Sequence, residues 1–215
     1  MVMNNQSEIS FDAAVPLGVA ITQVNAQQRH IGIIYCIDGT PRLCHLASHH
    51  DLRDEPLPKK YLWGEIGIDE FSQSTVAAYV SEVSQNREIA YGLHSEGPCF
   101  DDAGRYVPQT HGKGLTCATF VLEIFDVLGF SLLNRDEWPK RPGDKDWQEN
   151  IIKIITPSAS PEHIETMRRD VGKVKRFCPE EVAAACLSTD HPVPFSEAEK
   201  LAEQILADVR SAFPS

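Results

Sequence analysis

The pattern of apolar and polar positions predicts strands in the first third of the chain. Residues 17–24 and 30–37 are rich in aliphatic and β-branched side chains, as is typical of strands. Asp-Gly-Thr at 38–40 follows the second run, and Asp-Gly is a strong signal for a hairpin turn. The return strand covers residues 41–47 and starts with a proline, which is tolerated at that position. We therefore expect an antiparallel hairpin here.

The pattern becomes mixed after the hairpin. A strand is predicted at 61–68 and a helix capped by Asp69 that runs to about residue 83, with a short candidate strand at 89–93. Residues 95–114 are rich in Gly, Pro and Asp, and loops of that length are usually functional or mobile. Residues 1–14 are polar, and we expect them to be frayed.

Beyond residue 134 the pattern is helical. The predicted helices cover residues 146–155, 161–171, 179–187 and 196–213. Ser196 and Glu199 form a capping-box pattern at the start of the last one.

The helical region divides the chain into two predicted parts. We expect a core at 11–136 and a helical extension at 137–215 packed on that core. The extension is where we expect a protein partner or a second copy to bind.

A buried helix is predicted at about 115–128, with Thr116 as its N-cap and Gly129 as its C-terminal stop. Cys117 then lies in the first turn, where unpaired N–H groups and the helix dipole favour a thiolate. A cysteine nucleophile needs that setting, because the thiolate is the attacking species. The alternative interpretation is that Cys117 is a small core side chain.

Composition narrows the function classes. The chain has 215 residues, a net charge of −11 and a pI of about 5.1, which argues against nucleic acid or an anionic membrane surface as a partner. No stretch resembles a signal peptide or has the length of a transmembrane segment. The six cysteines include no CxxC pair. We expect reduced thiols and a cytoplasmic protein.

Two histidines add candidate chemistry to the hairpin. His30 opens the first strand, and His45 lies near the end of the second. A turn at 38–39 brings these positions nearly opposite each other, so both imidazoles can lie on one face. If the Cys117 helix packs on this sheet, the three residues supply a nucleophile, a base and a group that orients the base.

These motifs resemble the permuted NlpC-type, papain-like thiol hydrolases, which include the lecithin–retinol acyltransferase group. The resemblance rests on a His-X-Gly strand, an acidic-Gly turn and a second strand ending in His-Leu, followed by Cys-Ala-Thr-Phe-Val at 117–121. It covers 30–47 and 114–125. It implies an α+β, circularly permuted papain-like core in which the nucleophile helix packs on a small antiparallel sheet. It also implies that Cys117 is the nucleophile, His30 the general base and His45 the orienting residue.

This chain departs from the family pattern at three points that bear on function. Thr116 stands where the family often has asparagine, the hairpin turn is longer, and the C-terminal hydrophobic anchor of lipid-acting members is missing. We therefore expect a cysteine peptidase or amidase that cleaves a peptide, peptidoglycan or isopeptide bond through a thioacyl-enzyme. The alternatives are a lipid acyltransferase or phospholipase, and a non-catalytic binding module on the same scaffold.

The remaining candidates concern substrate and metal binding. We expect Gly114 and Thr116 to contact a peptide or acyl-bearing substrate. His111 is a substrate contact, an alternative base or an exposed loop residue. His-His-Asp at 49–51 lacks a second ligand pair and a HExxH helix, so a solvated loop is expected rather than a metal site. No cofactor is expected.

Overall fold

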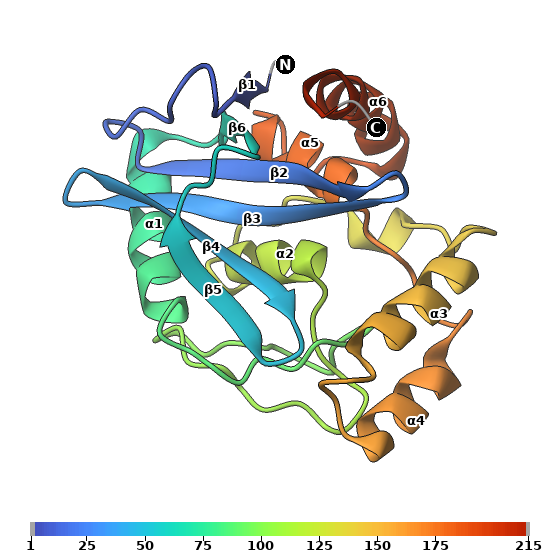
Figure 1. Cartoon of the computed structure of the whole chain (residues 1–215). Coiled ribbons are helices and arrows are strands. Elements are labelled where there is room, and N and C mark those ends of the chain that lie inside the picture. The colour runs from blue at the N-terminus through green and yellow to red at the C-terminus, as the bar shows by residue number, and fades with distance from the viewer. Residues whose placement is uncertain (1–2, 214–215) are drawn as a thin grey trace.

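The computed structural model, described here for residues 3–213, has a mixed α+β fold in which one antiparallel sheet precedes the helices (Figure 1). The sheet has the strand order β1-β6-β2-β3-β4-β5. Its strands are β1 (Asn4–Asn5), β2 (Leu17–Asn25), β3 (Gln28–Ile37), β4 (Thr40–Ser48), β5 (Asp51–Pro56) and β6 (Leu62–Glu65). The helices are α1 (Glu70–Val83), α2 (Cys117–Val127), α3 (Asp144–Ile155), α4 (Pro161–Asp170), α5 (Pro179–Leu187) and α6 (Phe195–Ala212).

Successive side chains of the central strands point to opposite faces of the sheet, and both faces are apolar. Ile31 and Ile33 of β3 join the main core, which also contains residues of α1, α2, α5 and α6. Ile34 instead joins a smaller cluster on the other face, with Leu43 and Tyr61. Because α5 and α6 contribute to the same core as the sheet, burial of their apolar faces stabilises both predicted parts together.

The predicted hairpin is confirmed. Ile37 pairs with Thr40, and Asp38 and Gly39 between them have φ of 55° and 73°. Two consecutive positive φ values suit the right-handed twist of the flanking strands, and Asp-Gly adopts them at low cost. The helix capped by Asp69 is also confirmed, since the Asp69 carboxylate accepts a hydrogen bond from the Ser72 N–H at 3.0 Å.

The four predicted C-terminal helices are present, but the capping box at Ser196 is wrong. α6 begins at Phe195, and its N-cap is Pro194, which makes no side-chain cap hydrogen bond. Helices α5 and α6 pack against each other, and α5 also contacts β2 and β3. α5 is therefore part of the layer that covers the sheet (Figure 1).

The prediction of a frayed N-terminus is wrong for residues 3–14. Met3 and Phe11 are buried, and β1 pairs with β6. The Phe11 ring packs edge-on against Trp63 with centroids 5.0 Å apart, and the Trp63 indole N–H donates to the carbonyl of Ile9 at 2.8 Å. Two apolar side chains thus fix a polar segment to the sheet.

The strands of the structure differ from the predicted ones at two further places. Residues 89–93 form no strand, and their only ladder contact in the described chain is a bridge between Tyr91 and Leu115. β5 was missed because its sequence, DLRDEP, is mostly charged. Charged side chains suit an edge strand, which exposes one side of its backbone. Within residues 3–213, no helix is both long and apolar enough to cross a membrane.

Candidate active site

The helix that carries the candidate nucleophile starts as predicted. Thr116 is the N-cap of α2, and its hydroxyl accepts the Thr119 N–H at 3.1 Å while the Thr119 hydroxyl accepts the Thr116 N–H at 2.8 Å. This reciprocal pair occupies the Thr116 side chain, so its observed role is to cap the helix. Cys117 is the first helical residue, and only 6% of it is exposed.

The start of α2 lies where β3 and β4 separate. The β3–β4 ladder extends from Ile37 and Thr40 only as far as Ile33 and Cys44, beyond which β4 pairs with β5 alone. α2 contacts both β3 and β4, and Figure 1 shows it behind the sheet at this opening.

The cysteine sulfur lies against the open edge of β3. A hydrogen bond from the Ile31 backbone lowers the pKa of the Cys117 thiol, as a donor to the thiolate would. The Cys36 N–H points to β2, where it donates to the Pro16 carbonyl, so the N–H of Ile31 points to the β4 side. The sulfur therefore faces the gap left by β4.

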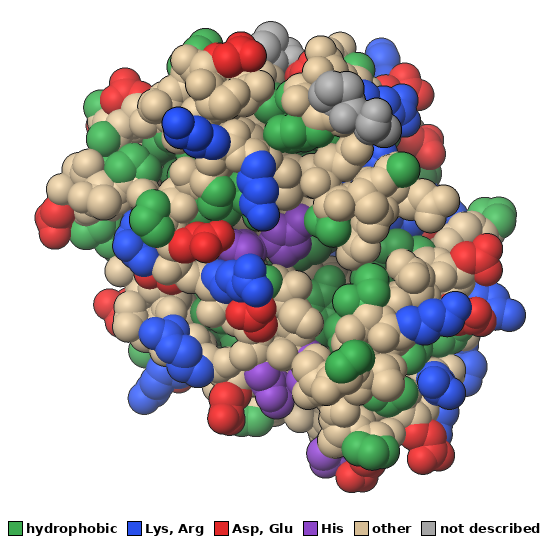
Figure 2. All heavy atoms as spheres, viewed as in Figure 1, with side chains coloured by type: hydrophobic (Ala, Val, Ile, Leu, Met, Phe, Trp, Pro, Cys, Tyr) green, Lys and Arg blue, Asp and Glu red, His purple; other side chains and the backbone are tan. Residues whose placement is uncertain are grey.

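The two predicted histidines are in contact. His30 Nε2 lies 2.7 Å from His45 Nδ1, and His45 Nε2 lies 3.2 Å from a carboxylate oxygen of Glu55 on β5. In the continued hairpin register His45 is opposite Gly32, so His30 is its diagonal neighbour on the same face. Figure 2 shows histidine side chains near the centre of this face, among charged side chains.

This chain of contacts determines where the protons lie. The Glu55 carboxylate accepts a hydrogen bond from His45 Nε2–H, so neutral His45 has an unprotonated Nδ1. That nitrogen accepts from His30 Nε2–H, which leaves Nδ1 of His30 with a lone pair. His30 Nδ1 is thus the basic atom of the relay. We refer to His30, His45 and Glu55 as the histidine relay.

The Cys117 thiol and the histidine relay are not hydrogen-bonded to each other. Side chains at even positions of β3, including His30, belong to the face of Ile34, whereas α2 packs on the face of Ile31. The hydrogen bonds found for the residues 3–213 include none between the Cys117 sulfur and either imidazole. The sulfur instead interacts with the Ile31 backbone and the Tyr91 side chain.

Burial dominates the protonation of both groups. It raises the pKa of the Cys117 thiol, and the contacts with Ile31 and Tyr91 offset this only in part. Burial, followed by the charges of His45 and Arg53, lowers the pKa of His30 to about 3. The expectation that the helix N-terminus alone favours a thiolate is therefore wrong for this closed arrangement. At neutral pH the resting pair is a thiol and a neutral imidazole.

The space beside Cys117 is small. The thiol lines a hollow of about 10 Å³, which is about the room that one water molecule needs. Arg29 and Tyr91 form part of its wall, and Trp147, Arg176 and Phe177 come from the C-terminal half of the chain. The residues that close the site are therefore distant from it in sequence.

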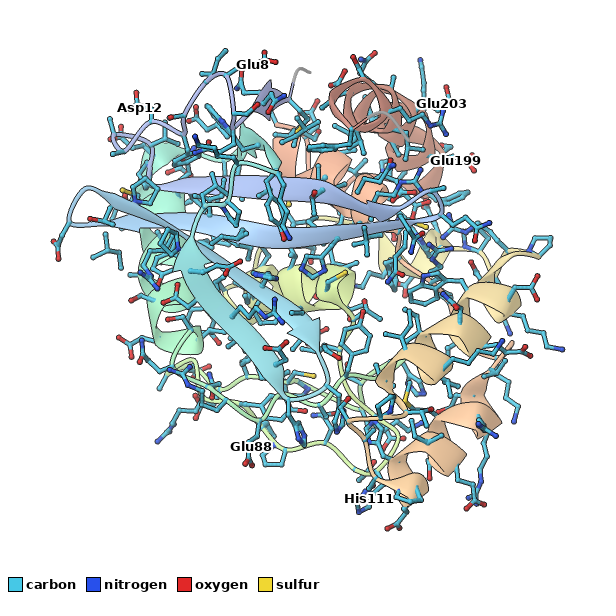
Figure 3. The ribbon with its side chains drawn as sticks, viewed as in Figure 1. Glu8, Asp12, Glu88, His111, Glu199 and Glu203 are labelled. Carbon is cyan, nitrogen blue, oxygen red and sulfur yellow. The ribbon has the colours of Figure 1, made fainter. Side chains whose placement is uncertain are left out.

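The loop candidates do not gather at the site. His111 is exposed and lies 3.5 Å from the Glu162 carboxylate, and Figure 3 shows it beside the start of α4. Its prediction as a substrate contact is not supported by this position. Gly114 is needed for close packing, since a Cβ there would lie 2.2 Å from the Ala90 carbonyl oxygen.

The histidines at 49 and 50 lie in the turn between β4 and β5, where His50 is exposed as expected but His49 is buried. His49 is 7% exposed, stacks on His50 with centroids 3.9 Å apart, and accepts the Tyr91 N–H at Nδ1 over 3.2 Å. His163 holds the same segment, because its Nε2 lies 2.8 Å from the Tyr91 carbonyl oxygen. In the described part of the chain, no group of three or more His, Cys, Asp or Glu is placed to hold a metal ion.

Sequence reasoning missed Glu55 and the contact of Tyr91 with Cys117. Glu55 lies opposite Leu43 on β5, so finding it would have required the register of an edge strand with no apolar pattern. Tyr91 reaches Cys117 through its bridge to Leu115, which joins segments that are not consecutive in the chain.

Comparison with known proteins adds no family assignment. No protein-family model matches the chain, and no match was found among curated proteins or solved structures.

Proposed function

We propose that this protein is a cysteine hydrolase with a permuted papain-like core that cleaves an amide bond through a thioacyl-enzyme. Cys117 is the nucleophile, His30 the general base, and His45 and Glu55 position His30. The observation that carries the proposal is the histidine relay, which directs a free lone pair to His30 Nδ1 one residue away from the backbone that contacts the Cys117 sulfur. An ordinary surface histidine would not need such a pair of partners.

The relay supplies a complete acylation step. His30 Nδ1 takes the thiol proton as Cys117 Sγ bonds to the carbonyl carbon, and the carbonyl electrons move to oxygen. The N–H of Cys117, at the start of α2, and a second donor hold this oxyanion. When the oxyanion collapses, the C–N bond breaks and His30 gives its proton to the leaving amine.

Water then removes the acyl group. His30 Nδ1 takes a proton from water as its oxygen attacks the thioacyl carbon, and the C–S bond breaks. The carboxylic acid leaves, and the proton returns from His30 to the thiolate. Because the resting thiol and imidazole are both neutral, proton transfer accompanies attack and no stored ion pair is required.

The test is labelling with an acyl-type electrophile followed by mapping of the modified residue. We expect the label on Cys117, and little on Cys36 or Cys178. His30→Gln should slow labelling of Cys117, whereas His94→Gln should not, since His94 pairs with Asp170 outside the relay. The proposal is contradicted if the label is spread over other cysteines. It is also contradicted if His30→Gln leaves the labelling rate of Cys117 unchanged.

The non-catalytic binding module is the second candidate. It is favoured by the small hollow and by the lack, among the contacts found in residues 3–213, of a thiol–imidazole hydrogen bond. Catalytic hydrogen bonds are often long before substrate binds, so the missing thiol–imidazole bond does not by itself establish the binding module. The labelling experiment distinguishes the binding module from the cysteine hydrolase. The lipid alternative gains no support, because no wide apolar groove adjoins Cys117 within the described residues.

A further inference from the structure

Two arginines share the hollow with the Cys117 thiol. Arg29 is the residue before His30 on β3, and Arg176 lies between α4 and α5. The Nε atom of each is buried and has no hydrogen-bond partner among the described residues. A buried, unpaired guanidinium N–H costs free energy, so an anionic group in this space would be bound strongly.

The position of Arg176 is fixed by its surroundings. Its guanidinium lies 4.3 Å from the ring centroid of Trp147, and its backbone carbonyl accepts a hydrogen bond from Arg141 at 2.8 Å. Burial raises the pKa of Tyr91, the side chain that contacts the Cys117 sulfur, and the charge of Arg176 offsets this only in part. Arg176 is thus close to the reacting atoms without being used by the mechanism above.

The charge around the hollow differs in sign from the net charge of the whole protein. The protein has a net charge of −11, yet neither Asp nor Glu is among the residues that line the hollow. The hollow of about 10 Å³ holds about one water molecule, so its lining residues must move apart before a carboxylate enters, and a planar carboxylate requires less movement than a tetrahedral phosphate.

We propose that Arg29 and Arg176 bind a carboxylate of the substrate next to the acyl group that Cys117 attacks. The inference rests on the proposed function and adds the substrate class, an acyl donor that carries a carboxylate near the scissile bond. Each guanidinium donates its Nε–H to the carboxylate, and the pair sets specificity rather than moving protons.

Alkylation of Cys117 provides the test. Iodoacetate and iodoacetamide both transfer a carbon to the thiolate and release iodide, but only iodoacetate carries a carboxylate. We expect the ratio of the iodoacetate rate to the iodoacetamide rate at Cys117 to exceed the same ratio at Cys36 by about tenfold. Cys36 is half-buried on β3 and serves as the reference in the same molecule.

Substitutions assign the effect to the two arginines. Arg29→Gln and Arg176→Gln should each bring the ratio at Cys117 toward that of Cys36, and Arg176→Lys should give an intermediate value. Arg210→Gln, on an exposed position of α6, removes the same charge and should leave the ratio unchanged. An unchanged iodoacetamide rate in a variant shows that its site is still folded.

Each contrary outcome has a distinct meaning. Equal ratios at Cys117 and Cys36 overturn the carboxylate site and leave the nucleophile intact. Protection of Cys117 from iodoacetamide by inorganic phosphate but not by succinate also overturns it. If neither reagent reaches Cys117, the proposed function fails and the carboxylate site fails with it.

Discussion

The Cβ of His45 lies only 2.7 Å from where a Cβ on Gly32 would be. The Cys44 carbonyl oxygen would lie 2.9 Å from the same atom, so the backbone could not yield easily. Gly32 is therefore required because His45 and β4 approach β3 closely at this point, which lets the His45 ring reach His30.

Gly32→Ala tests that dependence. We expect it to lower the free energy of unfolding by about 1–3 kcal/mol, because the added methyl forces His45 and β4 to shift. It should also slow labelling of Cys117, since the contact between His30 and His45 is lost. Gly143→Ala is the matched control, because a Cβ at Gly143 meets nothing within 4 Å and its φ is −76°. Urea denaturation measures the free energy of unfolding of both variants. If Gly32→Ala and Gly143→Ala are equally stable, the close approach of β4 to Gly32 has no cost in stability.

Glu55→Gln tests the direction of the proton relay. Burial lowers the pKa of His45, and the hydrogen bond and charge of Glu55 offset this only in part. Removing the charge should lower the His45 pKa further and weaken its Nε2–H tautomer. Nitrogen-15 shifts of the imidazoles, recorded against pH, report both properties. Glu65→Gln is the control, since Glu65 bonds Gln73 away from the relay. A His45 pKa that is unchanged or higher in Glu55→Gln would contradict this role.

The elements that local rules specify were predictable from the sequence. Asp-Gly at 38–39 determines the hairpin, and the alternating apolar positions of β3 determine its face. The cap at Thr116 follows from a side chain and a backbone N–H only a few residues apart. These local signals were enough to place Cys117 at a helix start and the two histidines on one sheet face.

The features set by long-range packing were not predictable. Burial of Cys117 depends on Trp147, Arg176 and Phe177, whose sequence neighbourhood gives no sign of a contact with residue 117. That burial reverses the pKa expected from the helix dipole, because loss of hydration outweighs a partial charge. Likewise, only the tertiary contact with Trp63 explains why Phe11 orders the N-terminal segment.

The reactivity of Cys117 should increase steadily with pH. Burial raises its thiol pKa, and His30 has a pKa of about 3, so no imidazolium is present near neutral pH to stabilise a thiolate. We expect the iodoacetamide rate at Cys117 to rise about tenfold per pH unit from pH 6 to pH 9, as the thiolate fraction does below a thiol pKa. Mass spectrometry of quenched samples measures the rate. A plateau that begins between pH 4 and pH 7 would mean that His30 removes the thiol proton during alkylation or that a thiolate–imidazolium pair is present, and would contradict alkylation through a free thiolate.

At acid pH, protonation of His49 should break its hydrogen bond with the Tyr91 N–H and destabilise the fold. Burial, with the charges of His50 and His163, lowers the pKa of His49 from 6.5 to about 4. The unfolded chain therefore binds this proton at a higher pH than the folded chain, so the stabilisation is complete above pH 6.5 and is lost as the pH falls to about 4. The loss from His49 is about 3 kcal/mol. Below pH 4 its Nδ1 is protonated and no longer accepts the Tyr91 N–H.

His49→Asn isolates this contribution, because the asparagine oxygen replaces the Nδ1 acceptor without titrating. Urea denaturation at pH 7 and pH 4.5 should show a smaller loss of stability in this variant than in the wild type. His111→Asn is the control, since His111 is exposed and should leave the wild-type loss unchanged. An equal loss in His49→Asn and the wild type would mean that other groups, including His30 and His163, account for the acid sensitivity.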